Sequence, residues 1–284
     1  MAADRKEQRT LALALLASLL LWNLPFGGVL LYPFKLLATW LHESSHGIAM
    51  LLGGAGFDHI LVYRDTSGLA YARNTVGPIW SAVIAAAGYM GTPVWGAVLL
   101  VAARDARSAR RALLVLAALL VGTALFVIAP TRDGDSFGPY AIGAIGVAVF
   151  ACALLLPGRV RLLGAHFLAA QACCNALLDI RVLMRPSQVV GGKVAGASDA
   201  TNMAAATFGT TEPWAVHTWA AIWLAWSLVV LFVALRISGS RAASSAARGD
   251  RSKAAPRDES DRDARRRSPA TAPGGTDPSE PAGT

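Results

Sequence analysis

The chain has 284 residues, of which 54% are hydrophobic and only 15% are charged, and its mean hydropathy is +0.45. A soluble domain of this length would carry nearer a quarter charged residues, so the composition excludes an ordinary soluble protein and indicates a polytopic membrane protein. Much of the net charge of +8 lies in loops and at the ends, which is typical of topology signals and of contact with the lipid bilayer, and we expect no nucleic-acid partner.

Apolar segments follow one another after a polar N-terminus of residues 1–10, and several reach the roughly 20 residues that a bilayer-spanning helix needs. We predict seven of them, at residues 11–31, 35–54, 79–102, 112–130, 139–157, 162–184 and 214–236. The predicted fold is therefore an all-α, multi-pass bundle in the cell membrane, with one membrane-embedded domain over residues 11–236.

Three stretches break this pattern. Residues 57–75 are β-branched and aromatic around the turn "RDTSG", which predicts a β-hairpin at the membrane surface or in a cavity, because open strands cannot face lipid. Residues 185–213 form a polar loop rich in Gly, Ser and Thr. Residues 237–284 lack aromatic and large aliphatic side chains beyond Ile237, so we predict a disordered tail.

The stretch "HESSHG" at residues 42–47 places ionisable groups inside an apolar segment. On a helix, His42 and His46 share a face and can present two imidazoles to one metal ion. Glu43 lies about 100° around the helix, within reach of a metal-bound water. In this HExxH arrangement two histidines bind zinc and the glutamate is the general base. The alternative is that these groups cap a helix end or line a polar interface.

A catalytic zinc site usually has a third protein ligand. Gln171, Asn175 and Asp179 follow at i, i+4 and i+8 and form a polar stripe on an apolar helix. Asp179 is the predicted third ligand, and Asn175 could hydrogen-bond a substrate carbonyl. Asp179 could instead pair with Arg181 at the membrane edge. Asp199 is the alternative ligand, although a solvated or helix-capping role is the default for an aspartate in a polar loop.

These residues resemble the site-2 protease family of intramembrane zinc metallopeptidases, and most closely its small bacterial and plant-type branch. The motifs that carry the resemblance follow in order: "HESSHG", "LLGG" before the predicted hairpin, "AAGYMG" at 86–91, "NALLDI" at 175–180 and "SDAT" at 198–201. The resemblance implies a Zn²⁺ cofactor on His42, His46 and Asp179, with Glu43 as base. One departure is that Ile180 stands where better-known members have glycine, and no proline follows Asn175.

The first hypothesis is therefore an endopeptidase that hydrolyses membrane-protein substrates with a Glu43-activated zinc water. The alternative is a non-proteolytic membrane protein that uses the metal structurally or binds a partner. A transporter would show paired repeats, which the sequence lacks. Orientation stays open, because dense arginine near 103–111 and 158–161 favours that side as cytoplasmic, whereas the resemblance favours the hairpin side. The sequence does not set the substrate or the oligomeric state.

Overall fold

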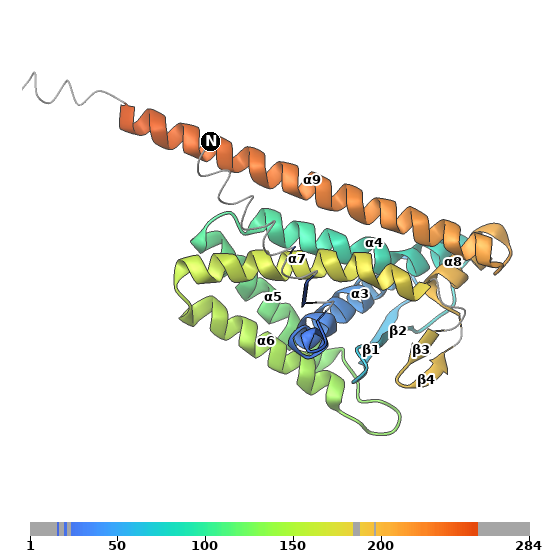
Figure 1. Ribbon diagram of the computed structural model, residues 1–284. Coiled ribbons are helices and arrows are strands. Elements are labelled where there is room, and N and C mark those ends of the chain that lie inside the picture. The colour runs from blue at the N-terminus through green and yellow to red at the C-terminus, as the bar shows by residue number, and fades with distance from the viewer. Residues whose placement is uncertain (1–15, 17–19, 22–23, 184–187, 196, 255–284) are drawn as a thin grey trace, which may run out of the picture. The chain divides into compact units, whose positions relative to one another are not determined.

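The computed structural model describes residues 16, 20–21, 24–183, 188–195 and 197–254 (Figure 1). Its helices and strands follow in the order α2 (Gly27–Leu30), α3 (Tyr32–Leu52), β1 (Phe57–Val62), β2 (Gly68–Ala72), α4 (Pro78–Ala102), α5 (Ala106–Phe126), α6 (Phe137–Leu155), α7 (Gly158–Leu183), β3 (Gln188–Val190), β4 (Lys193–Ala195), α8 (Asp199–Phe208) and α9 (Pro213–Ala254).

Five helices of the described chain are long and apolar enough to cross a bilayer: Pro78–Ala102, Ala106–Phe126, Phe137–Leu155, Gly158–Ile180 and Pro213–Ile237. The protein is thus a multi-pass membrane protein, and five of the seven predicted segments have a counterpart. The first predicted segment, 11–31, lies largely outside the described residues. The second corresponds to α3, which is not among the five because Lys35 and the HExxH residues lower its hydropathy.

The predicted hairpin is present. β1 and β2 pair antiparallel, with Ile60 opposite Ala70 and an irregularity between Phe57 and His59. The outer edge of β1 is covered, because the N–H of Ile60 donates to the carbonyl of Val127 and its carbonyl accepts from Ala129, both at 3.0 Å. The second edge of the sheet, on β2, therefore remains for other contacts.

The predicted polar loop of residues 185–213 contains regular structure. β3 and β4 form a second antiparallel hairpin, whose turn residues Gly191 and Gly192 have φ of 60° and 74°, a conformation that glycine adopts without strain. The helix α8 follows, capped by Ser198 at its start and by left-handed Gly209 at its end. The helix α9 ends at Ala254, and residues 255–284 lie outside the described chain, so the disordered tail of residues 237–284 stays a prediction.

The long helices α4, α5, α6 and α7 run alongside one another, and both hairpins and α8 lie at one end of them (Figure 1). Buried apolar residues of α3, β1, α5 and α6 form one continuous core that includes Trp40, Ile60, Leu120 and Ile142. Trp40 satisfies its buried indole by donating to Thr123 on α5 at 2.8 Å. This core fixes α3, and with it the HExxH residues, against the membrane helices.

Candidate metal centre

The helix α3 carries the HExxH residues on its buried side. Pro33 lies in its first turn, where a missing N–H costs nothing, and the apolar residues that follow keep the helix packed on both sides. Glu43 and His46 are 7% and 6% exposed. Because His42 and His46 are four residues apart, one helical turn brings their rings together, with centroids separated by 4.7 Å.

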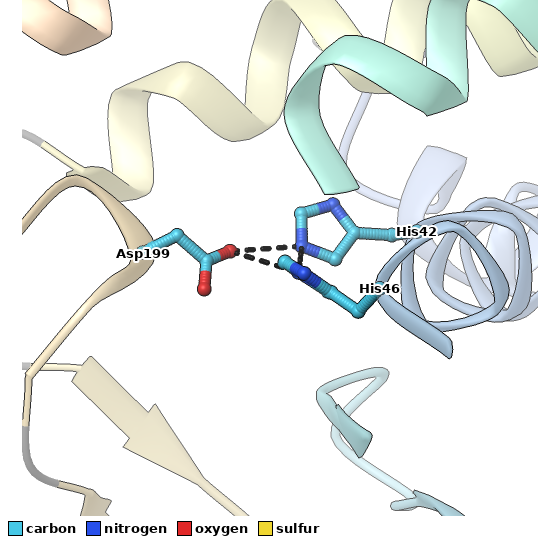
Figure 2. A group of neighbouring side chains, drawn as sticks. All are labelled: His42, His46 and Asp199. Atoms are coloured by element: carbon cyan, nitrogen blue, oxygen red, sulfur yellow. Dashed lines mark hydrogen bonds and ion pairs between the residues drawn. The ribbon is translucent and has the colours of Figure 1, made fainter. Parts of the chain in front are cut away.

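Asp199, the first residue of α8, meets both histidines (Figure 2). Its Oδ2 atom lies 3.0 Å from Nε2 of His42 and 3.2 Å from Nε2 of His46, and the two Nε2 atoms lie 3.0 Å apart. Within the described chain these three residues form the one group of His, Cys, Asp or Glu side chains close enough to share a metal ion. The geometry therefore favours Asp199 over Asp179 as the third donor.

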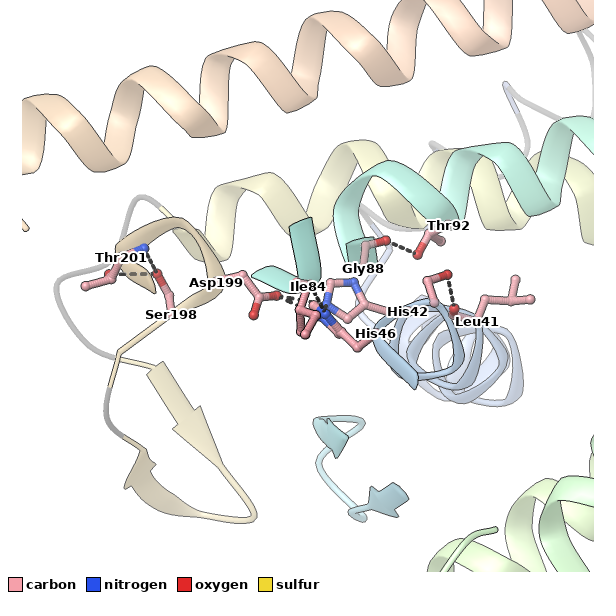
Figure 3. A network of polar contacts seen from close by, with 10 residues as sticks. Leu41, His42, His46, Ile84, Gly88, Thr92, Ser198, Asp199 and Thr201 are labelled. Carbon is pink, nitrogen blue, oxygen red and sulfur yellow. Dashed lines mark hydrogen bonds and ion pairs between the residues drawn. The ribbon is translucent and has the colours of Figure 1, made fainter. Parts of the chain in front are cut away.

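Two backbone contacts orient these donors (Figure 3). Nδ1 of His46 lies 2.6 Å from the carbonyl of Ile84; a carbonyl only accepts, so Nδ1 carries the proton and Nε2 of the neutral ring turns its lone pair towards the group. The hydroxyl of Ser198 accepts from the N–H of Thr201 at 3.1 Å. This cap fixes the first turn of α8 and hence the position of Asp199.

The three donors fit a divalent metal. Ligands about 2.1 Å from a tetrahedral zinc lie roughly 3.4 Å from one another, a little more than the 3.0–3.2 Å separations here. The backbone also leaves space for the group, because a Cβ atom on Gly88 would lie 2.3 Å from Nε2 of His42 and 2.5 Å from Nε2 of His46. Two imidazoles and one carboxylate are a donor set that catalytic zinc sites use.

The electrostatics of Asp199 favour a cation at the same place. Burial alone would raise the pKa of the Asp199 carboxyl, but the charge of His46 and the hydrogen bonds with both imidazoles lower the pKa well below its usual range. The Asp199 carboxylate therefore stays ionised, which is the form in which an aspartate binds a metal ion.

Glu43 lies beside this group and is not one of its donors. The N–H of Ala70 on β2 donates a hydrogen bond to its carboxylate. Gly68 leaves room for that carboxylate, since a Cβ atom there would lie 2.7 Å from Cγ and 3.0 Å from Oε1 of Glu43. The hairpin thus holds Glu43 next to the candidate metal position.

All of these side chains line one cavity of ≈ 1060 Å³, which α3, β2, α4, α7, β3 and α8 enclose. Asp179 also lines it, within electrostatic range of His42 and Lys35 but outside the donor group. Asn175 lines it too, and its side-chain nitrogen donates to the carbonyl of Gln171 at 2.9 Å. The side chain of Arg181, the other predicted partner of Asp179, is outside the described set.

Membrane helices and a partly buried His-His-Asp group at their end define the protein as a membrane protein with a candidate metal centre. The family comparison agrees with that class: residues 11–234 match the model of the Peptidase M50B-like family. The chain belongs to this family, which is the site-2 protease family of membrane metallopeptidases. The searches of curated proteins and of solved structures give no match.

Proposed function

We propose that the protein is an intramembrane zinc endopeptidase. The observation that carries the proposal is the convergence of His42, His46 and Asp199 on one point beside Glu43, in a polar cavity of a membrane peptidase. His42, His46 and Asp199 would hold zinc and leave one position for water. When bound, the zinc lowers the pKa of that water towards neutrality and polarises the scissile carbonyl.

Glu43 is the proposed general base. It lies one residue after His42 and points into the cavity, where it accepts the proton of the attacking water and passes it to the leaving amine. Its hydrogen bond from Ala70 keeps the carboxylate oriented before substrate arrives. A site that only bound metal structurally would need the three donors and no such base.

The outer edge of β2, where Ala70 contacts Glu43, is the proposed substrate-binding edge. The backbone N–H and carbonyl of Ile60 point away from β2. Ala70 lies directly opposite Ile60 in a non-hydrogen-bonded pair, so the backbone N–H and carbonyl of Ala70 point away from β1. Gly68, Ala70 and Ala72 all line the cavity. An unwound stretch of a membrane-protein substrate can pair with this edge and present its carbonyl beside Glu43. Asn175 would then contact the peptide from the α7 side.

The test measures zinc and cleavage together. The purified protein is analysed for metal and incubated with single-span peptides that carry a helix-breaking centre between a fluorophore and a quencher. Glu43→Gln should keep about one zinc per chain and the wild-type melting temperature, and should lose cleavage by about a hundredfold or more. Unchanged cleavage in this variant would rule out the base, and wild-type protein without zinc would rule out the metal site.

The same experiment decides the alternative. A wild-type protein that binds zinc and cleaves none of the peptides would favour a non-proteolytic module that binds metal or a partner. Glu43 argues against the non-proteolytic alternative. Its side chain is only 7% exposed and is not one of the three metal donors, and a buried carboxylate in a membrane protein is costly unless it has a function.

A further inference from the structure

The two histidines of the donor group are supported differently. His46 has the usual second contact of a metal-binding histidine, from Nδ1 to the carbonyl of Ile84. His42 lacks it, because no residue of the described chain hydrogen-bonds its Nδ1 atom. Some other contact must fix the plane of the His42 ring if Nε2 is to stay directed at the donor group.

Tyr89 on α4 makes that contact. Its ring meets the His42 ring edge to face, with centroids 4.7 Å apart and planes at 89°. Tyr89 is 5% exposed and reaches the cavity wall. Aromatic pairs in this arrangement contribute about 0.5–1.5 kcal/mol beyond burial and prefer a defined angle, so Tyr89 limits rotation of the imidazole.

Trp223 on α9 holds Tyr89 in turn. The two rings stack with centroids 5.1 Å apart and planes at 5°. Trp223 is fully buried, and its indole N–H has no hydrogen-bond partner within the described residues. Among the described residues this indole is therefore held by packing of its ring.

We propose that Tyr89 and Trp223 are positioning residues of the metal centre, which fix the His42 imidazole through a continuous ring stack from α3 over α4 to α9. This inference rests on the proposed metal site and assigns a role to Trp223 beyond apolar packing. The neighbour Trp226 offers a matched control: it is also on α9 and also contacts α4, through its Nε1 and the carbonyl of Met90 at 3.0 Å, but it is not part of the stack.

The experiment measures zinc affinity of the folded, full-length protein by competition with a chromogenic chelator, with melting of the metal-free protein as a folding control. Tyr89→Leu and Trp223→Leu should each weaken zinc binding by about tenfold or more, the usual effect of losing a contact that orients a ligand. Tyr89→Phe keeps the ring and should bind zinc as the wild type does. Trp226→Leu should lower the melting temperature without lowering affinity.

A second readout covers variants that fold poorly. Trp223→Phe keeps an aromatic face and should retain more affinity than Trp223→Leu, and the visible spectrum of the Co²⁺-loaded protein should change in Tyr89→Leu and stay the same in Trp226→Leu. Wild-type affinity in Tyr89→Leu and Trp223→Leu, or an equal loss in Trp226→Leu, would overturn the ring stack and leave the proposed peptidase intact. Absence of zinc in the wild type would overturn both.

Discussion

Two carboxylates, Asp199 and Asp179, face the same cavity with different surroundings. Asp199 is 3.0–3.2 Å from the imidazole nitrogens of both histidines, whereas Asp179 lies outside the donor group, within electrostatic range of His42 and Lys35. We predict that Asp199→Asn removes most of the zinc, because an amide oxygen carries no charge to replace the carboxylate. Metal analysis of the purified variant, with circular dichroism to confirm its helices, measures this.

Asp179→Asn is the matched comparison, since it makes the same chemical change on the same cavity wall. It should keep zinc close to the wild-type level. The reverse result, with zinc retained in Asp199→Asn and lost in Asp179→Asn, would identify Asp179 on α7 as the third ligand.

Gly88 sets the space available to the metal centre. A methyl group there would approach both Nε2 atoms to within 2.5 Å, so the imidazoles would have to turn away from the donor group or the helices move apart. We predict that Gly88→Ala abolishes zinc binding. Gly96→Ala, on the same helix, places its methyl 2.8 Å from the sulfur of Cys173 and should cost stability while leaving zinc bound. Equal zinc in Gly88→Ala and wild type would contradict the steric argument.

At the scale of residues, local spacing was enough to pair His42 with His46, because one helical turn determines their separation. The third donor depends on how far α7 and α8 lie from α3, which no local pattern encodes. The stripe of Gln171, Asn175 and Asp179 did indicate the helix that faces the cavity. Ser198, a typical helix-capping residue, indicated that a helix begins at Asp199. The polar composition of residues 185–213 nevertheless favoured the prediction of a loop.

At the scale of elements, the two hairpins meet tip to tip. The side chains of Ser67 and Asp65, in the turn between β1 and β2, accept the N–H groups of Gly191 and Gly192, each at 3.0 Å. These contacts tie the β3–β4 hairpin to the β1–β2 turn. The β1–β2 turn and the strand β3 both border the cavity.

We predict that the double variant Asp65→Ala, Ser67→Ala speeds amide hydrogen exchange at residues 191–192 by about tenfold, the equivalent of roughly 1.4 kcal/mol for the lost hydrogen bonds. Exchange followed by mass spectrometry measures it. Asp133→Ala is the control, because it removes only the exposed 3.7 Å ion pair with Lys193, which is worth little. An equal effect of the two changes would mean that the tip contacts do not hold the hairpin.

The first hairpin was predictable because its strands are long and its turn is polar. The second was missed, since each of its strands has three residues, although Gly-Gly between β-branched residues is a known hairpin signal.

At the scale of the whole bundle, the connections between consecutive helices lie alternately at its two ends. The β1–β2 turn, the α5–α6 connection and the β3–β4 turn meet through Arg64 with Asp135 and Lys193 with Asp133. The α4–α5 and α6–α7 connections meet through Arg161, which donates to the carbonyl of Ala106 at 3.2 Å. This is the alternation that five successive crossings produce, and it places the candidate metal centre near the first end.

That arrangement predicts membrane sidedness. Single cysteines in place of Asp133 and Gly192 should react from one side of the membrane, and cysteines in place of Ser108 and Arg159 from the other. The second end carries Arg104, Arg107, Arg110, Arg111, Arg159 and Arg161, so the positive-inside rule predicts that it is cytoplasmic. A membrane-impermeant thiol reagent on intact cells, in a background without Cys152, Cys173 and Cys174, should therefore label positions 133 and 192 and spare 108 and 159. Labelling of the opposite pair would reverse the orientation while keeping five crossings, and labelling of 108 together with 133 would refute the alternation itself.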